Sequence, residues 1–462
     1  METGEKRSLI HRLKDVPPVR LIVSSFFIII VIGAILLALP ISARGRQATD
    51  LLSSFFTSTS ATCVTGLVVF DTWTHWSAFG QVVILGLIQL GGLGLVTFTS
   101  GFTLFLRRRL DLRDMQIAKE YTNGSTLDLP RLLRTIIFFT FVCEAIGSFL
   151  LMLRFVPLFG GRGIWISIFL SVSSYCNAGF DILGFLRPDA SLELFAGDPL
   201  VCLTISFLII LGGIGFIVAV DVYNWGRKRL KKEERRPHLT LHSRIVLVST
   251  VSLLALGTIL VFGLEYNHTL KDLSFWEKLN ISFFQSVTAR TAGYATIPQG
   301  ELGDATKLVT IILMFIGASP SSTGGGIKTT TFVVLVATVF SVSRGRDETV
   351  INKRRVDKSV VYRSMTIVTM ALVVIAITSS VIMITTPPEI SAIDSIYEAV
   401  SAFGTVGLTT GLTPGLSIAA KIFVMLTMFI GRVGPISLAL ALTMKHNGSA
   451  GKILPEGKVI VG

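Results

Sequence analysis

Cys63-Val64-Thr65-Gly66 is the first of four short stretches that organise this 462-residue chain. The other three are Cys176-Asn177-Ala178-Gly179, Arg290-Thr291-Ala292-Gly293 and Gly404-Thr405-Val406-Gly407. From Gly66 to Gly179 is 113 residues, and each of the next two intervals, to Gly293 and then to Gly407, is 114 residues. A single glycine is most often a packing residue, but four at nearly constant spacing indicate a unit that occurs four times.

The same apolar pattern surrounds each glycine. Each unit has a long apolar segment, then a short one of about a dozen residues, then the glycine and a second long segment; only the long segments suffice to cross a bilayer. The first long segments are Leu21–Leu39, Thr135–Leu153, Ile245–Leu264 and Tyr362–Thr386. The short ones are Asp50–Thr62, Ile164–Tyr175, Phe275–Ala289 and Ile393–Phe403. The returning long segments are Phe79–Leu106, Pro199–Tyr223, Ala305–Val342 and Ile418–Met444.

This pattern predicts an all-α membrane protein with eight transmembrane helices. The helices form four pseudo-fourfold repeats of helix, re-entrant pore helix, filter loop and helix around one central pore. We expect repeats at residues 21–109, 131–226, 243–343 and 360–445, a cytosolic N-terminal arm at 1–20 and a C-terminal tail at 446–462. The axis of such an arrangement is where an ion-conducting site is expected.

Composition and charge agree with a membrane protein. The chain is 51% hydrophobic and 15% charged, with a mean hydropathy of +0.69, which is too apolar for a soluble domain. Its net charge of +13 gathers in the N-terminal arm and in three connectors, Arg107–Arg134, Arg227–Arg236 and Arg344–Arg363. The positive-inside rule places these connectors and both termini in the cytoplasm of a multi-pass protein of the cell membrane. Because the charge follows topology, lipid headgroups or an acidic cytosolic partner are expected there, and nucleic acid is not.

The four glycine stretches have the chemistry of a cation filter. A short helix directs the negative end of its dipole at the membrane centre, and the loop beyond it turns backbone carbonyls toward a dehydrated cation. Glycine suits this loop because it adopts positive φ without a Cβ clash. The predicted ion-binding residues are Val64, Thr65, Gly66, Asn177, Ala178, Gly179, Thr291, Ala292, Gly293, Thr405, Val406 and Gly407.

The returning segment of the third repeat contains a break that a helix tolerates poorly. It reads Gly317-Ala318-Ser319-Pro320-Ser321-Ser322-Thr323-Gly324-Gly325-Gly326-Ile327-Lys328, and each helical glycine costs about 1 kcal/mol relative to alanine. The other returning segments have only Gly91-Gly92, Gly212-Gly213 and Gly431 there. We expect a movable gate below the filter in this one wall, with a passive kink as the alternative. No nucleotide is expected on this chain, because Ile327 separates the last glycine from Lys328 and no strand precedes the stretch.

Several charged residues fall at membrane depth. Arg432 lies mid-span in the fourth repeat, where a charge is costly unless it faces the pore or a partner. Facing the pore it would form an electrostatic barrier to cations, and we count it with Lys328 as part of the gate. The alternatives are an ion pair of Arg432 with Glu144, and a snorkelling position for Lys328. Arg290 precedes the third filter and is expected to pair with a carboxylate such as Glu398.

Two other classes of protein compete with a pore. A secondary solute transporter that works by alternating access is expected to have inverted repeats with helices broken in pairs, whereas these repeats share one orientation and one predicted break. A membrane enzyme is not favoured, because the sequence offers no metal-ligand cluster and no nucleophile–base pair. Its six histidines, mainly in predicted loops, are His11, His75, His238, His242, His268 and His446.

The four loops, the eight-span layout and the length resemble the Ktr/Trk/HKT superfamily of potassium transporters, particularly the bacterial Ktr-type membrane (pore) subunit, over nearly the whole chain. Members of that superfamily keep one glycine in each filter loop. A serine in the first loop is associated with sodium preference in the plant relatives, and this chain has Gly66 there. Only Thr405-Val406-Gly407 approaches the TVGYG pattern of tetrameric potassium channels.

The resemblance implies potassium uptake, passive or sodium-assisted, with K⁺ at the filter residues and an intramembrane gating loop in the third repeat. Less selective K⁺/Na⁺ conduction or Na⁺-coupled transport is the alternative. The resemblance also implies a homodimer in which each pore subunit has its own pore. The dimer would be seated on a cytosolic ring of nucleotide-binding regulatory subunits of the Ktr/Trk RCK type.

Overall fold

The computed structural model describes residues 18–105, 129–231, 238–387 and 390–443. Nearly all of the predicted N-terminal arm, the C-terminal tail at 446–462 and the basic residues of the first connector, Arg107 to Lys119, lie outside the described residues. Helices make up most of the described chain, and its only ladder is the antiparallel pair of β1 (Val350–Ile351) and β2 (Arg354–Arg355). The predicted all-α class is confirmed.

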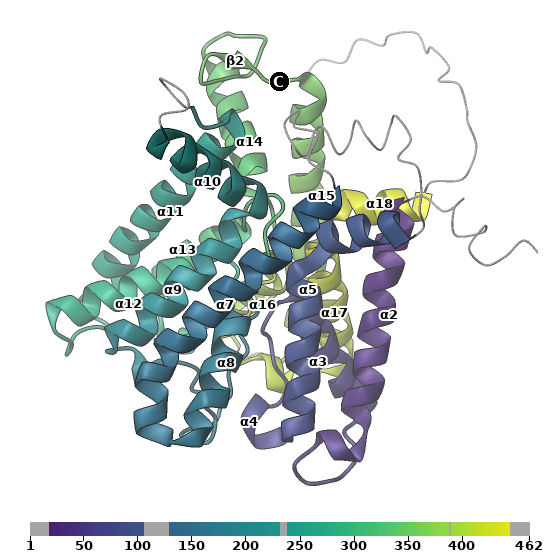
Figure 1. The fold of residues 1–462 in the computed structure, drawn as a ribbon, viewed down its shortest axis with the longest axis vertical. Helices are drawn as coiled ribbons and strands as arrows, with labels where there is room; N and C mark the ends of the chain where they lie inside the picture. Colours follow the sequence, from purple (N-terminus) through teal and green to yellow (C-terminus); the bar gives the residue numbers. More distant parts are fainter. Residues whose placement is uncertain (1–17, 106–128, 232–237, 388–389, 444–462) are drawn as a thin grey trace, which may run out of the picture.

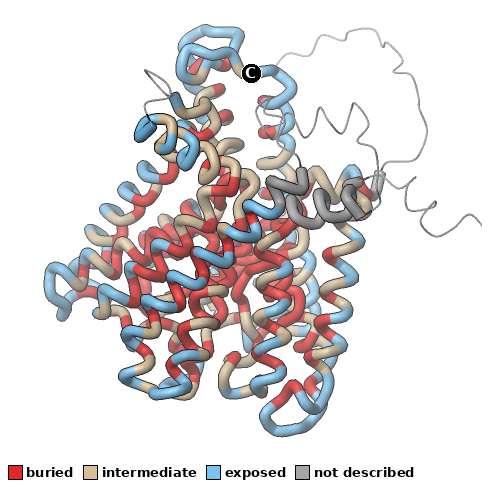
Figure 2. The backbone as a smooth tube through the Cα atoms, viewed as in Figure 1, coloured by how far each residue is buried: buried red, intermediate tan, exposed pale blue. Residues whose placement is uncertain are grey.

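Each repeat begins with a long apolar helix (Figure 1). These are α2 (Pro18–Ala38), α7 (Leu129–Phe159), α11 (Leu241–Glu265) and α15 (Lys358–Thr385). By length and composition all four are able to cross a membrane. Phe138, Ile259 and Ile384 on these helices are 71%, 68% and 81% exposed, which in an aqueous protein would be unfavourable and in a bilayer places them against lipid. Figure 2 shows the buried residues concentrated inside this exposed outer surface.

A shorter helix follows each long one and ends where the predicted filter residues begin. The short helices are α3 (Leu51–Cys63), α8 (Gly161–Tyr175), α12 (Phe275–Thr288) and α16 (Ala392–Gly404). At 1.5 Å per residue they are about 20 Å long and do not cross a bilayer core of about 30 Å. Local chemistry sets their starts: Asp50 accepts the Ser53 N–H at 3.0 Å, and Ser274 and Glu277 form a reciprocal capping box.

A serine hydroxyl fixes the short helix to the long helix in three of the repeats. The three bonds, at 2.7, 2.7 and 2.9 Å, are Ser58 Oγ to Ile30 O, Ser171 Oγ to Glu144 O and Ser286 Oγ to Leu254 O. Three residues further along each long helix a glycine leaves room for the hydroxyl, and a Cβ there would lie under 3.0 Å from it. These glycines are Gly33, Gly147 and Gly257. In the fourth repeat Ala371 of α15 and Ala399 of α16 are both buried.

All four returning segments are interrupted, so the prediction of a break in the third wall alone is wrong. The four segments are α5 (Ala78–Phe105), α9 (Pro199–Ile214) with α10 (Phe216–Leu230), α13 (Asp304–Phe315) with α14 (Thr329–Ser343), and α17 (Ile418–Val433) with α18 (Pro435–Thr443). Gly94 kinks α5 at φ 51°, and Gly215 and Gly434, at φ 95° and 92°, end α9 and α17. Left-handed torsions are inexpensive only for glycine, so each glycine stops the helix that precedes it.

The interruptions change the direction of the chain. The axes bend by 98° between α9 and α10 and by 96° between α17 and α18, and α18 lies across the end of α2 (Figure 1), where Arg20 Nε donates to Ala441 O at 2.7 Å. The predicted returning spans Pro199–Tyr223 and Ile418–Met444 are therefore not straight helices. Counted as one pass each, the two bent pairs bring the spans recognised by length and composition to six in the described chain. The kinked α5 and the divided α13–α14 complete the eight predicted passes.

Gly257 and Gly263 lie on the same helix and provide a test of the contact between long and short helices. A Cβ at Gly257 would collide with Ser286 Oγ and Leu313, whereas a Cβ at the exposed Gly263 meets nothing within 4 Å. We expect Gly257→Ala to lower the free energy of unfolding by about 1–2 kcal/mol through loss of the Ser286 bond and local crowding. Gly263→Ala should leave it unchanged or raise it slightly. Thermal unfolding in detergent measures both, and equal midpoints for the two variants would contradict this account.

Candidate functional site at the four glycine loops

The four loops begin with the same unusual backbone torsion. The residues two positions before each glycine are left-handed, with φ of 57°, 59°, 68° and 49° at Val64, Asn177, Thr291 and Thr405. Such torsions cost about 1–2 kcal/mol each in a residue with a Cβ. They recur at equivalent positions in all four repeats because each short helix must stop there and turn its chain toward the same axis. No sequence signal predicts these torsions, because none of the four residues is a glycine.

The four predicted glycines meet one another. Their φ values are 96°, 70°, 86° and 93° at Gly66, Gly179, Gly293 and Gly407. A Cβ on each would lie under 3.0 Å from the carbonyl oxygen that precedes the next glycine. The glycine and carbonyl pairs are Gly66 with Ala178 O, Gly179 with Ala292 O, Gly293 with Val406 O and Gly407 with Thr65 O. The contacts therefore form a closed ring of four loops in chain order, and only glycine fits at its four corners.

Hydrogen bonds to the short helices orient the loop backbone. The N–H groups of Thr65, Ala178 and Val406 donate to the carbonyls five residues before them, at 2.8, 2.8 and 2.9 Å. In the third loop Ala292 N–H donates to Thr288 O, four residues back, at 3.0 Å. Because these N–H groups point back toward the short helices, the carbonyls are left for the ring. The twelve predicted ion-binding residues are buried, apart from a half-buried Gly293.

The intramembrane segment between α13 and α14 packs directly against the loops. Thr323 Oγ1 donates to Tyr175 O at 3.2 Å and to Asn177 Oδ1 at 3.3 Å, and Gly325 N–H donates to Thr405 Oγ1 at 3.1 Å. A Cβ at Gly324 would collide with Thr291 Oγ1. Three of the four left-handed residues thus contact the crest of this segment, residues 323–325.

The sides of the same segment are bound to the returning helices. Ser319 and Thr323 N–H groups donate to Gly213 O and Gly212 O, at 3.0 and 3.2 Å, and Gly326 N–H donates to Gly431 O at 3.3 Å. Glycines at these places are required by close packing against the ends of the short helices. A Cβ at Gly91, Gly212 or Gly431 would collide with the carbonyl four residues before the filter glycine of its own repeat, Thr62 O, Tyr175 O or Phe403 O. The irregular spacing of these glycines concealed their common role in the sequence.

Arg432 is bound to carbonyl oxygens. Its guanidinium donates to Thr323 O in the crest and to Gly91 O in α5, and the side chain is buried. Lys328 Nζ donates to Gly324 O at 2.7 Å, so it is not a snorkelling residue. The alternative ion pair of Arg432 with Glu144 does not form in the described chain: Glu144 Oε1 lies 3.9 Å from Cys176 Sγ instead.

The expected pair of Arg290 with Glu398 is wrong. Glu398 Oε1 accepts hydrogen bonds from Thr409, at 3.2 Å, and from Thr413. No carboxylate among the described residues lies within 4.0 Å of the Arg290 guanidinium. The hydroxyls of Thr409 and Thr413 supply the hydrogen bonds that Glu398 would otherwise take from an arginine. The pattern of charged residues in the sequence does not reveal that these neutral groups compete for the carboxylate.

Comparison with known proteins gives one family. Residues 18–450 match the profile of TrkH, described as a cation transport protein. The chain belongs to the TrkH family. The Ktr system potassium uptake protein B of Bacillus subtilis (strain 168) is 37% identical over 100% of both chains. The potassium/sodium uptake protein NtpJ of Enterococcus hirae is 39% identical over 97% of this chain and 98% of its own.

A solved structure supports the same fold. The crystal structure of the potassium transporter TrkH from Vibrio parahaemolyticus matches with a TM-score of 0.70, covering 94% of this chain and 86% of its own at 16% identity. The resemblance and the four-repeat membrane fold predicted from the sequence are confirmed. TrkH proteins are cation transporters, so the expectation of a multi-pass membrane transporter in place of an enzyme is confirmed by the family.

Gly407→Ala tests the closed ring. The substitution places a Cβ against Thr65 O at a φ of 93°, so we expect cation transport to fall to about a tenth or less, the effect of a disturbance of about 1.4 kcal/mol. Gly411→Ala and Gly415→Ala are the controls. Gly411 has a similar φ of 97° and open space around it, and Gly415 has open space without a positive φ. Transport by both controls should stay within about twofold of the wild type. A folded Gly407→Ala protein with wild-type transport would exclude the ring as the site.

Proposed function

We propose that this protein mediates potassium uptake across the cytoplasmic membrane through the axis of the four glycine loops. The observation that carries the proposal is the closed ring in which each glycine contacts the carbonyl of the next loop. Carbonyl oxygens that face a common axis replace the hydration shell of a cation, and the short helices direct their negative ends to the same place. Full-length relatives named for potassium uptake support potassium as the ion.

The ion-binding groups in this proposal are the backbone carbonyls of the twelve filter residues. Those immediately before the glycines, at Thr65, Ala178, Ala292 and Val406, contribute the ring itself. A second candidate, less selective K⁺/Na⁺ or Na⁺-coupled transport, is favoured by the name of the potassium/sodium relative.

We propose further that the segment from Ile316 to Lys328 is the gate. Its crest binds Asn177 and Thr405 at the inner end of the filter loops, so it lies in the path of an ion that leaves the ring. Neutral hydrogen bonds to Asn177 and Thr405, each worth about 1 kcal/mol net, hold the crest together with charge-assisted bonds from Arg432 and Lys328. A segment held by hydrogen bonds of this kind is stable when closed and is released when they break.

The partner and orientation in the proposal are those of the Ktr systems. We propose a homodimer in the cell membrane, with both termini in the cytoplasm and a cytosolic ring of nucleotide-binding RCK-type subunits as regulator. Three relatives carry the name of a Ktr system, and α10 supports a docking surface. This helix turns away from α9 by 98° and ends in the cationic run Arg227, Lys228 and Arg229.

Ion flux into liposomes that contain the purified full chain tests the function. We expect uptake of radiolabelled rubidium that potassium competes away, and we expect Gly293→Ser to lower both the flux and the preference for potassium over sodium. Gly415→Ala is the matched control, since its surroundings are open. Flux of an organic solute without cation flux would favour the secondary solute transporter, and an unchanged selectivity in Gly293→Ser would exclude the third loop from the filter.

Arg432→Gln tests the gate. The variant loses the charge-assisted bonds to Thr323 O and Gly91 O, each worth about 1.5–3 kcal/mol. Loss of about 1.4 kcal/mol from the closed state raises the open fraction about tenfold, so we expect a flux several times that of the wild type. Lys421→Gln removes a positive charge from the same helix without touching the segment and should change nothing. An Arg432→Gln flux at or below wild type would contradict a holding role.

A further inference from the structure

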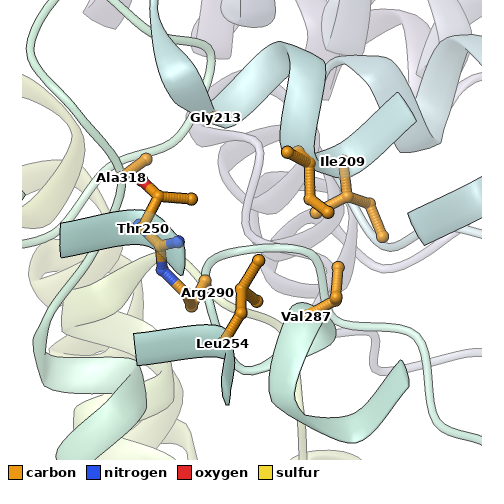
Figure 3. Close-up of a pocket in the computed structure, with 8 residues that line it drawn as sticks. Ile209, Gly213, Thr250, Leu254, Val287, Arg290 and Ala318 are labelled. Atoms are coloured by element: carbon orange, nitrogen blue, oxygen red, sulfur yellow. The ribbon is translucent and has the colours of Figure 1, made fainter. Parts of the chain in front are cut away.

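A small cavity lies behind the third filter loop (Figure 3). It is bounded by α9, α11, α12, the third loop and the start of the intramembrane segment, and its volume is close to that of one water molecule. The residues around it are Ile209, Ile210, Gly213, Thr250, Leu254, Val287, Arg290 and Ala318. Most of the wall is apolar, so its two polar side chains, Thr250 and Arg290, decide what it holds.

Arg290 has no partner in the described protein. The side chain is 8% exposed, its Nε is fully buried without a hydrogen bond, and no hydrogen bond or ion pair joins its guanidinium to another described residue. An isolated buried charge costs several kcal/mol, so buried guanidinium groups are paired with acceptors. Glu398, the carboxylate that the sequence suggested as the partner of Arg290, is bound to Thr409 and Thr413. The counter-charge must therefore come from outside the described side chains.

Thr250 is unpartnered in the same cavity. Its hydroxyl is buried and forms no hydrogen bond with the described chain. Figure 3 shows the guanidinium end of Arg290 on the side of the cavity where Thr250 and Ala318 lie. Two buried donors without an acceptor, one of them charged, thus face one small space. A ligand there must accept hydrogen bonds, carry negative charge and be little larger than water.

We propose that this cavity binds a small monovalent anion, with the chemistry of chloride, held by the Arg290 guanidinium and the Thr250 hydroxyl. A single-atom anion is the species that neutralises the guanidinium within so small a volume. The apolar walls from Ile209, Leu254 and Val287 exclude bulk water, which strengthens the charge-assisted bond.

The location gives the anion a second effect, which rests on the proposed function. Gly213 and Ala318 belong to the cavity wall, and Gly213 O accepts the Ser319 N–H at the start of the gate segment. An anion here reduces the positive potential that Arg290 imposes on a cation in the third loop. It also packs against the segment in its closed position. Chloride would therefore stabilise the protein and the closed gate together.

Anomalous scattering from bromide tests the site directly. We expect crystals of the full-length protein grown in bromide to show an anomalous peak between Arg290 and Thr250, and replacement of gluconate by chloride or bromide to raise the thermal midpoint by a few degrees. Arg290→Gln should lose the peak and the halide-dependent shift, and Thr250→Val should weaken both. Arg187→Gln, which removes an exposed arginine, should keep both.

Two results would overturn the proposal. One is the absence of a bromide peak at this cavity in well-ordered wild-type crystals, which would assign the cavity to water. The other is a halide-dependent shift of equal size in the wild type and in Arg290→Gln. If Arg290→Gln does not fold, the Thr250→Val peak height and shift decide the matter in the same way. Neither readout depends on ion flux, so failure of this site leaves the proposed potassium function untouched.

Discussion

Backbone groups at membrane depth must find partners without help from water, and the arrangement of this protein follows from how its four loops meet that requirement. The N–H groups before each filter glycine return to the short helices, as Thr65 N–H does to Ser60 O. The matching carbonyls accept no hydrogen bond from the described part of the chain and meet at the ring of glycines. Oxygen atoms that gather around one axis are unfavourable by themselves and favourable around a cation. In the proposed function, structure and conduction depend on this same set of carbonyl groups.

Sequence patterns predicted the parts of this architecture that repeat. The regular spacing of Gly66, Gly179, Gly293 and Gly407 located the loops, and the apolar segments before them located the short helices to within three residues. The breaks at Gly94, Gly215 and Gly434 escaped prediction because a lone glycine is tolerated inside a helix, and its torsion is decided by the packing around it. The partners of Arg432 and Arg290 escaped prediction for a related reason. The sequence suggests which carboxylate could pair with a buried cation. Only the fold decides whether hydroxyls bind the carboxylate, as they do at Glu398, or carbonyls bind the cation, as they do at Arg432.

The third repeat departs from the symmetry in several linked ways. Its short helix ends at Thr288, five residues before the filter glycine, whereas α3 and α16 end three residues before theirs. Arg290 stands where the other loops have Cys63, Cys176 or Gly404. The same repeat contributes the intramembrane segment that contacts the other loops. One shifted helix end therefore makes room for a buried charge behind the filter, next to the segment proposed as the gate. In the proposed function, the symmetric loops bind the ion and the asymmetric third repeat controls its passage.

Closure of the ring has a consequence for biosynthesis. Gly407 meets Thr65 and Gly66, and Arg432 meets Gly91 across 341 residues of sequence, so the last repeat to emerge from the ribosome joins the first. Contacts of such separation form late, because the entropy of closing so long a loop must be overcome first. A nascent chain with three repeats has three walls and no filter. If the ring is the cation site, as proposed, that site forms only when all four repeats have been made, and the membrane is spared an unselective leak during synthesis.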